Sequence, residues 1–95
     1  MRQKIYTIND FDFKPHMVIN GGVQGILKLP NNITVSIVGG GNHAGRLYGD
    51  GVDTFEVAAW YTDSGEWVEL GDDDGILRYV DKEKIPIILL DLSKK

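Results

Sequence analysis

Residues 23–37 of this 95-residue chain, VQGILKLPNNITVSI, decide the fold. On both sides of the central PNN, apolar and polar side chains alternate, which is typical of antiparallel strands with one buried face. A two-residue turn would place Leu29 opposite Thr34, whereas a three-residue turn places Leu29 opposite Ile33 and gathers the apolar residues on one face. Because a shift of one residue moves every side chain to the other face, we predict the three-residue turn, with Asn32 in the left-handed conformation.

A second hairpin is predicted in residues 54–70, TFEVAAWYTDSGEWVEL. A four-residue turn at 62–65, with Gly65 at a positive φ, sorts the side chains best. The pairs expected on the core side are Val57 with Leu70 and Ala59 with Val68. The same register places Trp60 opposite Trp67 on the other face, where acidic residues flank the two indoles.

The apolar spacing changes near the C-terminus. Among the apolar residues of this part, Ile85, Ile88, Leu89 and Leu92 recur at regular intervals. Their spacing of i, i+3, i+4 and i+7 predicts a helix, with Asp81 as its N-cap and Pro86 in its first turn. A strand over 85–92 is the alternative, because this run also suits a buried strand. We prefer the helix, since a small sheet must bury its apolar face against another element.

These elements predict one α+β domain over residues 1–95, a small hairpin-rich antiparallel sheet of about four to six strands with one C-terminal helix. Residues 2–8 are expected to form a further strand. Phe11 and Phe13, two positions apart in an extended segment, are expected to pack together at the core edge. The chain has no cysteine, so packing or oligomerisation must stabilise it, and a homo-oligomer stays open.

The composition, with 42% hydrophobic and 25% charged residues, is that of an ordinary globular domain. No apolar run approaches the roughly 18 residues that a membrane span needs, and no signal sequence comes after Met1. We therefore expect a soluble, cytoplasmic protein without membrane contact.

Charge is distributed unevenly along the chain. Residues 50–81 contain ten acidic residues against Arg78 alone, which gives this segment a net charge of −9, although the whole chain carries only −4. Direct nucleic-acid binding through this segment would bring carboxylates against phosphates. A basic protein partner is the better expectation.

Residues 38–51, VGGGNHAGRLYGDG, contain six glycines and separate the two hairpins. The simplest interpretation is an irregular connection. As an alternative, its backbone amides and Arg46 form a nest for an anion or a nucleotide. The residues of this alternative ligand site are Gly39, Gly40, Gly41, His43, Arg46, Tyr48 and Asp50. The segment does not match a dinucleotide or phosphate-loop fingerprint, because a strand comes after it and the terminal lysine is missing.

The sequence offers little support for catalysis or metal binding. His43 precedes Asp50 and Asp53, but nothing in this spacing brings the three side chains within reach of one another. Consecutive aspartates at 72–74 do not converge on one calcium ion. Without a cysteine or a serine in a nucleophile turn, nucleophilic catalysis has no basis either. We predict no catalytic residue, no metal and no cofactor.

Residues 33–60 combine a TVSIV strand, a glycine-rich gap, YGDG and a TFEVAAW strand. This order resembles a group of small bacteriophage proteins of unknown role, in which an asparagine-glycine turn, a VSIV-like strand, a loop, an EVAV strand and a C-terminal helix succeed one another. The chain departs from the group at Asn31-Asn32, where the turn lacks glycine, and at Pro86, because the helix of the group has no proline. The resemblance implies a phage or prophage origin and a place in the cytoplasm of an infected bacterium. It implies no activity.

The two tryptophans carry the functional expectation, because large rings on the non-core side of a hairpin are typical of binding hot spots. The alternative is that the N-terminal strand or a neighbouring loop covers both rings within the monomer. We expect a non-enzymatic interaction protein that binds a basic surface of a host protein, such as a defence enzyme that it inhibits. The expected contact residues are Trp60, Trp67, Glu56, Glu66, Glu69, Asp72, Asp73 and Asp74. A small-ligand binder that uses the glycine-rich loop, and a virion structural or assembly protein, are the alternatives.

Overall fold

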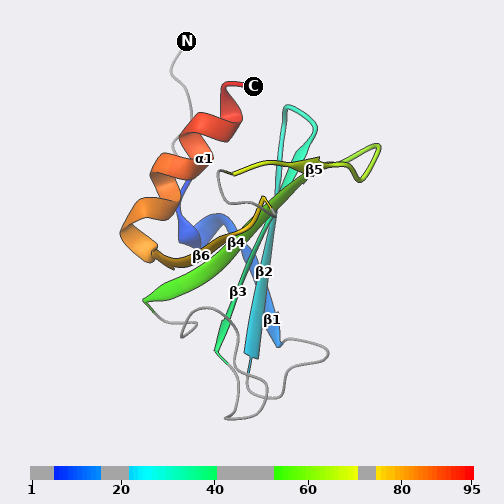
Figure 1. Ribbon diagram of the computed structural model, residues 1–95. Helices are drawn as coiled ribbons and strands as arrows, with labels where there is room; N and C mark the ends of the chain where they lie inside the picture. Colours follow the sequence, from blue (N-terminus) through cyan, green and yellow to red (C-terminus); the bar gives the residue numbers. More distant parts are fainter. Residues whose placement is uncertain (1–5, 16–21, 41–52, 71–74) are drawn as a thin grey trace.

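The structure is a computed structural model that describes residues 6–15, 22–40, 53–70 and 75–95. Its elements, in chain order, are η1 (Ile8–Asp10), β1 (Asp12–Pro15), β2 (Gly22–Leu29), β3 (Ile33–Gly40), β4 (Thr54–Tyr61), β5 (Trp67–Val68), β6 (Leu77–Asp81), η2 (Lys82–Lys84) and α1 (Ile85–Ser93). The strands form one antiparallel sheet in the order β1-β2-β3-β4-β5, and β6 also pairs with β4 (Figure 1). The predicted α+β class, a small antiparallel sheet with one C-terminal helix, is confirmed.

The register predicted for the β2–β3 hairpin is confirmed. Leu29 pairs with Ile33, and the same register places Leu27 opposite Val35. Asn32 closes the turn at φ 70°, in the left-handed region that asparagine tolerates better than most residues. Leu27, Leu29, Ile33, Val35 and Ile37 therefore lie on one face of the sheet.

The β4–β5 hairpin is confirmed in its turn and in its first pairs. Tyr61 N donates to Glu66 O at 2.8 Å across the four-residue turn, in which Gly65 adopts φ 75°. Ala59 pairs with Val68 and Trp60 with Trp67, as predicted.

One core-side pair of this hairpin was predicted wrongly. Val57 lies opposite Leu77 of β6, not opposite Leu70. The physical reason is that β5 contains only Trp67–Val68, so the remaining edge of β4 is open to a second short strand. The sheet edge beyond β4 is thus shared by β5 and β6.

β6 meets this edge through a bulge. Leu77 pairs with Val57 and Val80 with Phe55, so β6 holds one more residue than β4 over the same stretch. In a regular strand, residues three positions apart point to opposite faces. Tyr79 absorbs the extra residue at φ 53°, and as a result both Leu77 and Val80 pack toward the core.

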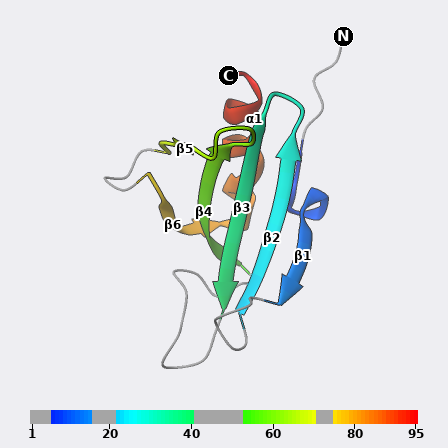
Figure 2. The ribbon, with the colours of Figure 1, turned by 90° about the vertical axis from the view of Figure 1, so that its right-hand side faces the viewer.

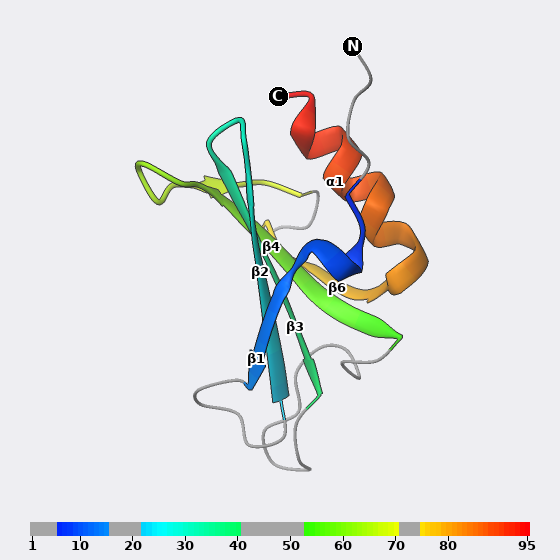
Figure 3. The same cartoon turned by 180° about the vertical axis from the view of Figure 1, so that it is seen from behind.

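The helix α1 covers the apolar face of the sheet (Figure 3). Pro86 lies in its first turn, where the missing N–H costs no intrahelical hydrogen bond. Asp81 was expected as the helix N-cap; it precedes the short turn η2 instead, and its side chain makes no capping hydrogen bond. The buried apolar residues of the core are Phe11, Leu29, Ile33, Val35, Ile37, Phe55, Val57, Ala59, Val68, Val80, Ile85, Leu89 and Leu92.

The N-terminal segment closes one side of this core. Tyr6 and Thr7 belong to no strand and Ile8 begins the 3₁₀ turn η1, so the strand expected over residues 2–8 is wrong for residues 6–8; residues 2–5 lie outside the described ranges. The rings of Phe11 and Phe13 lie 6.2 Å apart, as the extended spacing predicted; Phe11 is buried, whereas Phe13 stays 39% exposed and also lies 6.2 Å from the ring of Phe55. Gly25 permits this packing, because a Cβ atom there would come within 2.8 Å of the Phe13 ring.

The β2–β3 turn is tied to the end of the helix. Asn31 Nδ2 donates to the carbonyl of Leu92 at 2.8 Å and reaches the carbonyl of Lys95 at 3.4 Å. The last carbonyls of a helix have no intrahelical donor, so the amide satisfies groups that would otherwise depend on water. This contact holds the C-terminal end of α1 against the β2–β3 turn.

Replacing Asn31 tests this tie. Asn31→Ala should lower the free energy of unfolding in urea by about 1 kcal/mol, the value of one such hydrogen bond. Asn31→Asp should cost more, since a carboxylate cannot donate and would face the negative end of the helix dipole. Asn9→Ala, at an exposed position, serves as the control and should leave the urea midpoint unchanged. Equal stability of Asn31→Asp and the wild type would contradict the assignment.

Candidate interaction surface

The face of the sheet opposite α1 carries three rows of side chains that run across the strands. The rows are Lys28, Thr34, Trp60 and Trp67; Asp12, Ile26, Ser36 and Ala58; and Lys14, Gln24, Val38 and Glu56. Figure 2 shows the sheet from this side, with α1 behind it. We call this side the outer face; within the described ranges, no helix covers it.

The polar residues in the middle of the outer face are closed in by their neighbours. Thr34 and Ser36 are only 3% and 6% exposed. Gln24 Nε2 donates to Ser36 Oγ at 3.4 Å, and the hydroxyls of Thr34 and Thr62 lie 2.7 Å apart. The centre of the outer face therefore has its hydroxyls satisfied within the protein.

The two tryptophans form an aromatic pair at the β4–β5 end of the outer face. Their ring centroids are 5.8 Å apart and the ring planes stand at 83°, an edge-to-face arrangement that favours both rings. Trp60 is half-buried, whereas Trp67 is 60% exposed. The inner ring thus supports the outer one and holds a large apolar surface toward solvent.

The turn of the tryptophan hairpin is fastened to the β2–β3 turn. Thr62 N donates to Asn32 O at 2.8 Å, and Asp63 N donates to Asn32 Oδ1 at 3.1 Å. The Thr34–Thr62 contact adds a third link between the two turns. The strand that carries Trp67 is short, so these links position it.

The structure places only some of the acidic residues that were predicted to contact the partner on the side of the tryptophans. Glu56 shares the outer face with the indoles, and Glu69 is exposed two residues beyond Trp67. Glu66 is exposed but pairs with Tyr61, so strand alternation directs it away from the tryptophans. Asp72, Asp73 and Asp74 lie outside the described residues.

Sequence reasoning missed two lysines on this face. Lys14 and Lys28 stand on β1 and β2, at the far ends of the rows that hold Glu56 and the tryptophans. Lys14 lies 3.8 Å from Asp12 on its own strand. The sequence contained a signal for Lys28: it lies between Leu27 and Leu29, so strand alternation places it on the face opposite these two core-side leucines. The outer face is therefore cationic toward β1–β2, and it is aromatic and acidic toward β4–β5.

The alternative ligand site falls mostly outside the described residues, which contain neither Gly41, His43, Arg46, Tyr48 nor Asp50. Gly39 and Gly40 were expected in a loop, but they extend β3 and pair with Val23 and Gly22. Backbone pairing with β2 is favourable enough to continue the strand through both glycines, and Gly40 adopts φ 82° at its end.

Within the described ranges, no three histidine or acidic side chains are placed to hold a metal ion. None of the helices described is long and apolar enough to cross a membrane. Comparisons with known proteins gave no match among family models, curated proteins or solved structures.

The contact between Asp63 and the β2–β3 turn makes the stability of the protein depend on pH. The side-chain amide of Asn32 and, to a smaller extent, the backbone N–H of Ser64 stabilise the Asp63 carboxylate and hold its pKa below the ordinary value. A lowered pKa in the folded state adds stability that is fully present above the unfolded pKa of about 3.9 and is lost as pH falls through the folded pKa. Asp63→Asn should therefore be less stable than the wild type at pH 5, and this difference should shrink as the pH falls below the unfolded pKa of about 3.9. Urea titrations at pH values on both sides of the unfolded pKa measure the difference, and a difference independent of pH would contradict the contact.

Proposed function

We propose that this protein is not an enzyme and acts by binding a basic surface of another protein through the Trp60–Trp67 end of its outer face. The observation that supports the proposal most directly is the exposure of Trp67, an edge-to-face partner of Trp60 that remains 60% accessible. Exposed tryptophans at rigid positions are typical centres of protein interfaces, since they bury a large area at little cost in conformational entropy.

Charge supports a cationic partner at this end. Residues 50–81, which include β4, β5 and β6, have a net charge of −9. Glu69 comes two residues after Trp67, and Glu56 lies on the outer face four residues before Trp60; both are accessible at least in part. An arginine of the partner can stack on an indole face while pairing with Glu69. Nucleic acid, with its own negative charge, would be repelled.

The resemblance of residues 33–60 to small phage proteins supports a partner in the bacterial host. Host proteins that bind nucleic acid have basic grooves, and a phage protein with an acidic, aromatic face would block such a groove. A defence enzyme is the partner class that we propose, with inhibition in the cytoplasm of the infected cell as the result.

Capture from a bacterial lysate tests this function. Immobilised wild-type protein should retain a protein with a basic surface, and raising the salt from 0.05 M to 0.5 M should weaken the binding, because rim charges are screened. Once that partner is purified, Trp67→Ala should raise Kd by at least roughly 30-fold, the effect of losing a central aromatic hot spot. Glu56→Gln should slow association while leaving the fold intact.

Tyr79→Asn provides a matched control. Tyr79 is as exposed as Trp67, at 64%, but lies on β6, and asparagine tolerates its positive φ. This variant should bind as the wild type does. Unchanged binding by Trp67→Ala, or a partner whose contact surface is acidic, would refute the proposed function.

A further inference from the structure

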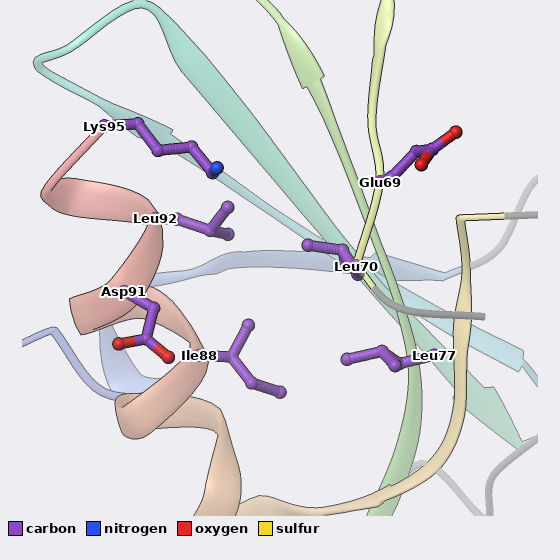
Figure 4. A pocket seen from close by; sticks show the side chains of 7 residues that line it. All are labelled: Glu69, Leu70, Leu77, Ile88, Asp91, Leu92 and Lys95. Carbon is purple, nitrogen blue, oxygen red and sulfur yellow. The ribbon is translucent and has the colours of Figure 1, made fainter.

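A furrow runs between α1 and the short strands β5 and β6, on the side of the molecule away from the outer face. It consists of two hollows, of about 330 and 380 Å³, that share Leu77 and Ile88. Figure 4 shows the first hollow, with Ile88 and Leu92 of α1 facing Leu70 and Leu77 across it. The two hollows therefore adjoin along the helix, and most of the surface that lines them is apolar.

The helix beside this furrow is apolar on more than its buried side. Asp91 is the only charged residue between Ile85 and Ser93. Ile87 is 62% exposed and Ile88 is only half-buried. Helices that are apolar around most of their circumference are normally covered on all sides, which indicates that something packs on this one.

The N-cap residue of α1 and three residues of the helix that are at least partly accessible form a self-complementary stripe. Lys84, Ile87, Ile88 and Asp91 have the spacing i, i+3, i+4 and i+7, so they lie on one side of the helix. The stripe is positive at one end, apolar in the middle and negative at the other end. If a second helix of the same sequence is laid antiparallel to it, Lys84 meets Asp91 and Ile87 meets Ile88, and each contact occurs twice.

We propose that the furrow is the docking site for a second copy of this chain, which seats its own α1 antiparallel to the first. Such a contact is the isologous interface that a two-fold dimer requires, with the dyad passing between Ile87 and Ile88. Within the described residues, neither Lys84 nor Asp91 forms an ion pair.

The far wall of the furrow supports an external contact. Tyr79, which lines the second hollow, is 64% exposed and held at φ 53°. The bulge in β6 imposes this left-handed conformation. In the dimer, the ring of Tyr79 closes the furrow over the second helix.

Analytical ultracentrifugation of the full chain tests the dimer. The wild type should sediment as a dimer at 100 μM, whereas Ile87→Lys should be a monomer with an unchanged circular dichroism spectrum, because the side chain is exposed in the monomer. Lys84→Glu and Asp91→Lys should each weaken the dimer roughly tenfold, since each places like charges together twice. The double variant should recover most of this loss.

This inference is independent of the proposed function, and two variants separate the two proposals. Trp67→Ala removes the aromatic pair from the outer face and should leave the dimer constant unchanged, whereas Ile87→Lys should leave capture of the basic partner by the monomer intact. A wild type that stays monomeric up to 1 mM, a dimer that survives Ile87→Lys, or a dimer that dissociates with Trp67→Ala would each overturn the proposal.

Discussion

The alternation of side chains along β3 is the constraint on which the rest of the structure depends. Ile33, Val35 and Ile37 are at most 1% exposed and form the floor of the core. Because strand side chains alternate strictly, this apolar set must lie on one face, and the hydroxyls of Thr34 and Ser36 must lie on the other. Both neighbouring strands take their register from β3, and α1 covers the face that β3 makes apolar.

This division gives the protein two surfaces with different chemistry. On the outer face, the satisfied hydroxyls of Thr34 and Ser36 lie in the centre, with lysines on the β1–β2 side and the tryptophan pair with Glu56 on the β4–β5 side. On the helical side, a furrow lies next to a stripe whose charge pattern complements itself. A face built from a sheet suits a broad contact with a charged partner, whereas a single helix beside a furrow suits a second helix.

Two turns hold these surfaces in a fixed relation. Asn31 reaches the end of α1, while its neighbour Asn32 bonds the turn between β4 and β5. One three-residue turn therefore anchors both the helix and the tryptophan hairpin. A substitution in this turn would therefore alter the position of both surfaces, although the turn belongs to neither. The short β5 strand depends on this anchor more than any other element, because two paired residues alone would not fix a hairpin.

The sequence by itself determined the features that arise from local pattern, namely the β2–β3 register, the turn at Gly65, the Trp60–Trp67 pair and the C-terminal helix. Each depends on strict alternation or on helical spacing over a few residues. The tertiary structure alone decided that Val57 pairs with Leu77, that Asn31 caps α1 and that Lys14 joins the tryptophans on one face. These contacts join segments far apart in the chain, and no local pattern encodes them, because they depend on how short strands compete for one sheet edge and on where the helix ends over the core.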